Sequence, residues 1–202
     1  MIDVPKSSSG KESIGEGSSA PAIIKNEALA SRQTMLAASK VLEKVAQDYP
    51  EIQPYLNLMQ FSEATMLGAA GVYTYSTSDN SSDRIIINRT VLGRPGSNTR
   101  GGTVSSTLEG ITAHEIGHAI SIKTQASYKD TKSAVQAAHR QYNRSVSKGE
   151  RLTEAGFART ISTYAATNYH EAFAEAFTDV YINGNNASRA SKLTIRNWRK
   201  GK

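Results

Sequence analysis

The chain has 202 residues, with four histidines, no cysteine and a formal net charge of +6. This length suits one compact domain whose core is large enough to need no disulfide. The absence of cysteine excludes disulfides and thiolate metal sites, so a transition-metal site would have to use His, Glu, Asp or water.

The N-terminal residues 1–22 are rich in Ser, Gly, Lys and Glu and poor in large apolar side chains. We expect them to be a disordered tail or linker, and residues 23–202 to form a single domain. They lack the apolar middle of a secretory signal. No stretch of the chain approaches the roughly 18 apolar residues that span a bilayer. A soluble protein is expected, and its location stays open between cytoplasm, virion and export by a route without such a signal. The oligomeric state also stays open.

The positive charge is concentrated near the C-terminal end of the chain. A basic balance favours nucleic acid or an anionic surface as a partner, whereas the simpler interpretation is a solvated helix face. No aromatic residues alternate with the basic ones to form a groove for single strands, so we do not expect a nucleic-acid partner. The residues are Arg189, Lys192, Arg196, Arg199, Lys200 and Lys202.

The first predicted elements lie before residue 92. Apolar residues at helical spacing predict a helix over 26–48, which Pro50 ends. A short helix or turn is expected over 54–61. Two β-rich runs at 71–75 and 84–91 predict strands that can pair as a hairpin. The second run, RIIINRTV, is interpreted either as an edge strand beside the next helix or as a buried central strand.

The chain after residue 92 is mostly helical in its pattern. The Gly-rich segment 93–102 is expected to be a loop, either a mobile lid over a cleft or a simple surface connection. Helices are predicted over 107–123, 132–147, 151–161, 168–182 and 187–198.

Residues 114–118 read HEIGH, an instance of the pattern H-E-x-x-H. A chance match is expected only about 0.005 times in a chain of this composition. On a helix, His114 and His118 project from the same face one turn apart, so both can bind one ion. Glu115 lies about 100° around the helix axis. Its carboxylate therefore lies beside the ion, where it can accept a proton from a water molecule.

A catalytic zinc ion takes a third protein ligand, and the segment 162–177 offers candidates. Glu171 and Glu175 are four residues apart on a helix rich in Ala and Phe, where two carboxylates without partners would be costly. One carboxylate binding zinc and the other accepting an N–H from a ligand imidazole resolves that cost. His170 adjoins this pair, whereas His139 is interpreted as a surface or packed histidine.

HEIGHA and a downstream Tyr-(x6)-Glu-(x3)-Glu pattern resemble the zincin metallopeptidases of the anthrax lethal factor type. This group is similar to the secreted Pro-Pro endopeptidases, and comparable domains occur in phage head-associated and toxin proteins. The resemblance covers roughly residues 107–182. It implies an α+β, zincin-like fold that is mostly helical, with a small twisted sheet whose edge strand flanks the active-site helix.

The resemblance also implies a role for each matched residue. His114, His118 and Glu171 would bind one zinc ion, and Glu175 would hold an imidazole. Glu115 would be the general base, and Tyr164 would donate its hydroxyl to the developing oxyanion. The implied activity is zinc-dependent endopeptidase cleavage of a protein or peptide substrate. The alternative is a phage virion, assembly or toxin-type protein in which the zinc site is mainly structural.

Overall fold

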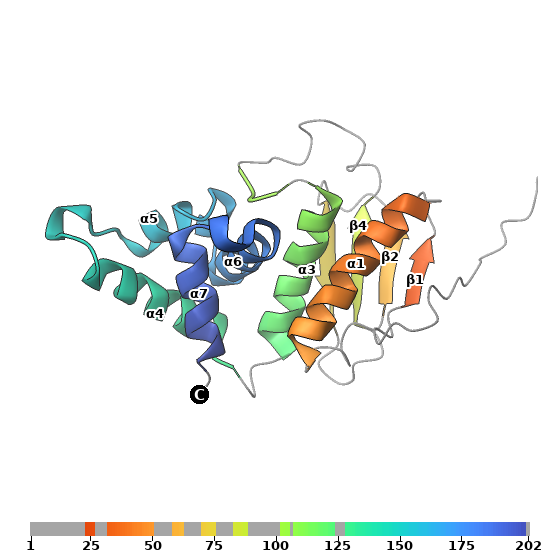
Figure 1. Ribbon diagram of the computed structural model, residues 1–202, viewed down its shortest axis with the longest axis horizontal. Helices are drawn as coiled ribbons and strands as arrows, with labels where there is room; N and C mark the ends of the chain where they lie inside the picture. Colours follow the sequence, from red (N-terminus) through yellow and green to blue (C-terminus); the bar gives the residue numbers. More distant parts are fainter. Residues whose placement is uncertain are drawn as a thin grey trace, which may run out of the picture.

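The protein has an α+β fold in which helices predominate (Figure 1). The computed structural model describes residues 23–26, 32–50, 58–62, 70–75, 83–88, 102–105, 107–123 and 128–200. The tail expected at 1–22 lies outside this part. So does the loop expected at 93–102, except for Gly102, whose φ is +77°.

The described strands form a four-stranded sheet in the order β1-β2-β4-β3. β1 and β2 are parallel, β2 and β4 are parallel, and β3 pairs antiparallel with β4. The predicted hairpin is therefore confirmed. The strands are β1 (Ile23–Asn26), β2 (Leu58–Ser62), β3 (Gly71–Thr74) and β4 (Arg84–Asn88).

Two predictions about the N-terminal half were wrong, and the structure decides between two alternatives for a third segment. Leu58–Ser62 is a strand and not a short helix or turn, because a short apolar run has no decisive period and its pairing partners lie far along the chain. Asn26 belongs to β1 and not to the helix that follows. β4 (within RIIINRTV) is an interior strand with Ile85 and Ile87 buried, which is the second of the two alternatives, and the edge strands of the described sheet are β1 and β3.

Six predicted helices correspond to the six α-helices of the described part of the chain. Figure 1 shows α1 and α3 crossing the sheet, with α3 between the sheet and α6, and α4, α5 and α7 beyond α6. The helices are α1 (Arg32–Asp48), α3 (Leu108–Lys123), α4 (Thr131–Arg144), α5 (Glu154–Arg159), α6 (Tyr169–Asn183) and α7 (Arg189–Arg199). Short 3-10 turns occur at Lys148–Glu150, Tyr164–Ala166 and Gly184–Asn186. None of the described helices is both long and apolar enough to cross a membrane.

The positions of the predicted ligand residues depend on how closely α3 packs against α6. Gly117 faces Ala174 so closely that a Cβ at position 117 would lie 2.9 Å from the Ala174 Cα atom. Ile116, Ile120 and Phe173 are fully buried around this contact. Gly117, which adjoins His118 in the sequence, therefore permits the two helix backbones to approach each other.

A buried ion pair attaches the β-hairpin to the end of α3. The Lys123 ammonium lies 2.8 Å from the carboxylate of Asp83, and the two side chains are 10% and 0% exposed. The Tyr73 hydroxyl donates a second hydrogen bond to Asp83, at 3.2 Å. The hairpin is therefore held to α3 by charge as well as by apolar packing.

Asp83→Ala should lower the free energy of unfolding by about 3–5 kcal/mol, because it leaves the Lys123 charge buried without its counter-ion. Urea unfolding followed by circular dichroism measures this change. The matched control is Asp48→Ala, which removes an ion pair of similar length, 3.2 Å, whose side chains are 55% and 48% exposed. The control should change stability by less than about 1 kcal/mol. Equal effects of the two substitutions would contradict this account of the hairpin.

Candidate metal centre

Helix α3 presents two imidazole rings to the same point. His114 and His118 are one helical turn apart, their ring centroids are 4.8 Å apart, and the rings are nearly perpendicular, at 82°. Their Nε2 atoms lie 3.1 Å from each other. The spacing of HEIGH on a helix therefore produces the predicted convergence of two nitrogen atoms.

Helix α6 brings a carboxylate to the same point. The Asn168 side chain accepts hydrogen bonds from the backbone N–H groups of His170 and Glu171, so α6 begins here and Glu171 lies in its first turn. A Glu171 oxygen, Oε2, lies 3.0 Å from His114 Nε2 and 3.4 Å from His118 Nε2. The structure thus brings together the three residues predicted as ligands, and together they could hold a metal ion.

The separations among these three atoms are close to those expected around a tetrahedral ion, with two of the three slightly shorter. Ligand atoms about 2.0–2.2 Å from a zinc ion lie about 3.3–3.6 Å from one another in a tetrahedral arrangement. The observed separations are 3.0, 3.1 and 3.4 Å. Two imidazoles and one carboxylate form a donor set that suits zinc and leaves a fourth position for water or substrate.

The Glu175 side chain lies behind His114 and is almost fully buried, with 2% of it exposed. One of its oxygens accepts from His114 Nδ1 at 2.9 Å, and the other accepts the backbone N–H of Val104 at 2.6 Å. A proton held at Nδ1 by Glu175 would leave the Nε2 lone pair available to a metal ion once Nε2 itself is deprotonated. Glu175 therefore lies outside the group that could hold a metal ion and is placed to orient His114, the position that the resemblance implies for it.

The charges of the centre favour a protonated His114 when no ion is present. Burial acts to lower the pKa of His114, but hydrogen bonds to Glu171 and Glu175 outweigh it and raise that pKa to about 10. Burial acts to raise the pKa of Glu171, whereas hydrogen bonds to His114 and His118 lower it further than burial raises it. A bound metal ion would replace the proton between these groups.

Glu115 is buried between α3 and strand β3, outside the ligand group. Burial raises the pKa of Glu115, and the nearby His114 and His118 oppose that rise. A buried carboxyl group with a raised pKa is suited to accepting and releasing a proton near neutral pH.

The free edge of β3 provides a hydrogen bond to Glu115. Asn88 donates its N–H to Ala70 at 2.9 Å, and Gly71 pairs with Ile87 in the next register position. Hydrogen-bonded and non-bonded pairs alternate along an antiparallel ladder, so the backbone groups of Tyr73 point away from β4. There the Tyr73 N–H donates to the Glu115 carboxylate, which lowers the pKa of Glu115.

Tyr164 begins a short 3-10 turn beside the ligands, and its ring centroid lies 6.0 Å from that of His114. Burial is the main cause that raises the pKa of Tyr164 to about 12, and the carboxylates of Glu171, Glu115 and Glu175 contribute. Its hydroxyl donates to Glu171. The phenol therefore remains a neutral hydrogen-bond donor at physiological pH.

The other two histidines lie outside the ligand group. His139 Nε2 lies 2.7 Å from the carbonyl oxygen of Leu152 and 2.8 Å from the Asn143 amide, in agreement with its prediction as a packed histidine. His170 is exposed at the start of α6. The backbone N–H groups of Val104 and Tyr73 also belong to the site, because they donate to Glu175 and Glu115. Sequence analysis missed them because a backbone N–H does not depend on the identity of the side chain.

Comparison of the chain with protein-family models, with curated proteins and with solved structures gives no match. The centre is therefore interpreted from its own geometry.

The two carboxylates should differ in their effect on metal affinity. Glu171→Gln removes a direct ligand, whereas Glu175→Gln removes one acceptor behind His114, a loss worth about 10–100-fold in affinity. Glu171→Gln should therefore weaken zinc binding more than Glu175→Gln does. Competition with a chromophoric chelator measures both affinities, and circular dichroism checks that both variants fold. The reverse order would assign the third ligand to Glu175.

Proposed function

We propose that this protein is a zinc-dependent endopeptidase of the zincin type. The observation that carries the proposal is the convergence of His114, His118 and Glu171, with a buried Glu115 and a neutral Tyr164 beside them. A zinc ion bound there would polarise a substrate carbonyl and make a water molecule more acidic. The chain's own residues would then perform the proton transfers and stabilise the charge that develops.

Glu115 is assigned the role of general base. Its carboxylate accepts a proton from the attacking water and later delivers it to the leaving amine nitrogen. The raised pKa of Glu115 supports this assignment, since a carboxyl group of ordinary pKa would hold a proton too weakly to pass it on at neutral pH. Glu175 keeps His114 in the tautomer that the reaction requires.

Tyr164 is assigned to the carbonyl oxygen of the substrate. Its hydroxyl donates to Glu171 in the free protein and can turn to an oxygen that acquires negative charge. An extended peptide substrate is proposed to lie along β3, which is the free edge of the described sheet next to α3.

The alternative is a virion-associated, assembly or toxin-type protein with a mainly structural zinc site. Structural zinc sites normally have four protein ligands. The group found in the described part of the chain has three, and their side chains are 12–17% exposed. A structural zinc site also performs no proton transfer and stabilises no oxyanion, so it requires neither a general base such as Glu115 nor a hydroxyl donor such as Tyr164. These features favour the peptidase.

Glu115→Gln should retain zinc and lose cleavage by a factor of about 100–10,000, because it removes the proton acceptor and keeps the side-chain volume. Cleavage of an unfolded, fluorescently labelled protein and elemental zinc analysis measure the two quantities. Glu109→Gln, in the first turn of the same helix, is the matched control and should cleave at the parent rate. Equal cleavage by Glu115→Gln and the parent would refute the mechanism. A parent protein that binds zinc and cleaves nothing would favour the structural alternative.

Gly71 of β3 makes room for the Glu115 carboxylate. A Cβ at position 71 would lie 2.8 Å from both Cγ and Oε1 of Glu115, and 3.0 Å from Cγ2 of Ile111. Any side chain at position 71 must therefore displace the carboxylate.

Gly71→Ala should keep zinc affinity near the parent value and reduce the cleavage rate by about 100-fold, because a misplacement of about 1 Å is that costly. Gly149→Ala is the control, since a Cβ at position 149 would have no atom within 4 Å. The stability cost of Gly71→Ala should also shrink in a Glu115→Ala background, where the obstructing atoms are gone. Additive stability changes would show that Gly71 does not act on Glu115.

A further inference from the structure

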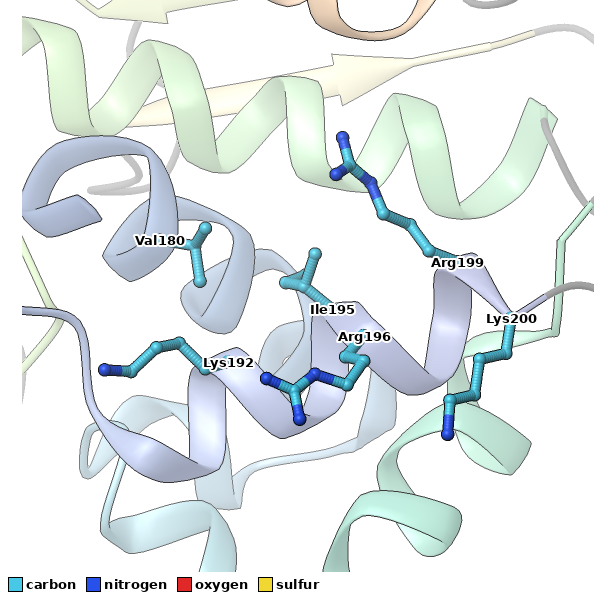
Figure 2. A pocket seen from close by; sticks show the side chains of 6 residues that line it. All are labelled: Val180, Lys192, Ile195, Arg196, Arg199 and Lys200. Atoms are coloured by element: carbon cyan, nitrogen blue, oxygen red, sulfur yellow. The ribbon is translucent and has the colours of Figure 1, made fainter. Parts of the chain in front are cut away.

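A pocket of about 400 Å³ lies on α7, away from the metal centre. Its apolar lining consists of Val180 from α6 and Ile195 from α7, and its remaining lining is cationic (Figure 2). Val180 is nine residues beyond Glu171 on α6, a distance of about 13 Å along the helix axis. The cations are Lys192, Arg196, Arg199 and Lys200.

The four cations follow one face of α7, at relative positions i, i+4, i+7 and i+8. Like charges at this spacing repel one another. Basic residues in the last turn are favoured by the helix dipole, which accounts for Arg196 and Arg199. It does not account for Lys192, which lies in the N-terminal half of α7.

Two of these cations are oriented by uncharged groups. The Arg199 guanidinium lies 4.6 Å from the ring centroid of Tyr49, which itself packs against Trp198. Lys192 donates to the backbone carbonyl of Asn185 at 3.1 Å. Within the described part of the chain, no carboxylate forms a salt bridge with any of the four. Among the described residues, Arg199 and Lys192 are therefore oriented by contacts that leave their charges without a carboxylate counter-ion.

We propose that this pocket binds an acidic peptide segment of a partner protein. An apolar side chain of that segment packs on Val180 and Ile195, and Asp or Glu residues on either side of it pair with the cations. An oriented arginine such as Arg199 recognises a carboxylate at low entropic cost, because its guanidinium is already held against the Tyr49 ring. The apolar part of the lining, Val180 and Ile195, is aliphatic, and no aromatic residue lines the pocket for base stacking, which favours a peptide over a single-stranded nucleic acid. The pocket shares no residue with the metal centre, so this proposal does not depend on the proposed peptidase activity.

The test uses a fluorescein-labelled peptide with two leucines flanked by glutamates, EELLEE, and measures its binding by fluorescence anisotropy. The peptide QQLLQQ tests the need for charge, and EEGGEE tests the need for an apolar residue. The pocket variant is Lys192→Glu/Arg196→Glu. The control variant, Arg140→Glu/Lys148→Glu, changes the net charge equally at two exposed positions outside the pocket. Circular dichroism establishes that both variants fold.

We expect EELLEE to bind the parent more tightly than either control peptide does. The pocket variant should bind it at least about tenfold more weakly, and the control variant should bind it nearly as well as the parent. A zinc chelator should leave the affinity unchanged. No binding by the parent, or equal losses in the two variants, would overturn the proposal. Tighter binding of a fluorescein-labelled single-stranded oligonucleotide than of EELLEE would also overturn it.

Discussion

The close contact between α3 and α6 is the constraint on which the candidate metal centre depends. His114 and His118 belong to α3, and Glu171 belongs to α6, so the distance between the two backbones determines whether the three ligand atoms can meet. Because Gly117 has no side chain, the Ala174 backbone can occupy the space next to it, which a Cβ atom at position 117 would otherwise fill. Burial of Ile116, Ile120 and Phe173 around this contact stabilises it without polar groups.

The polar groups around the centre are arranged in layers that support one another. The ligand atoms face one point, Glu175 fixes the ring of His114, and the backbone of Val104 fixes Glu175. On the other side, β3 holds the carboxylate of Glu115 by the N–H of Tyr73. Nearly every group that could titrate here is therefore held by a neighbour, which is how a site keeps its geometry before a ligand arrives.

Much of the centre could be predicted from the sequence because its signals are local. HEIGH positions three side chains by helical periodicity alone, and Glu171 and Glu175 are one turn apart on a second helix. The distinction between those two carboxylates rested on a resemblance, and the structure agrees with it through contacts that link α6 to α3. The predicted helices after residue 107 also match the described ones closely.

The sheet was harder to predict because its order depends on non-local pairing. RIIINRTV carries the strongest strand signal, but nothing in it shows that β2 pairs on one side and β3 on the other. The strand at Leu58–Ser62 was missed for the same reason. Gly71 contacts Glu115 and Val104 contacts Glu175 only because segments far apart in the sequence meet in the fold. Such contacts cannot be predicted from a local residue pattern.

The hydrogen bond from Val104 to Glu175 has a thermodynamic consequence. It connects the backbone at residues 102–105 to an imidazole that could bind a metal, through a single buried carboxylate. Coupling of this kind is reciprocal: a bound ion would favour the ordered form of the segment, and whatever orders the segment would raise the affinity for the ion by the same factor. Gly102 also accepts the N–H of Tyr164, at 3.4 Å, so the same segment adjoins the group proposed to act on the substrate. Metal binding and the conformation of the backbone before α3 would then be thermodynamically linked.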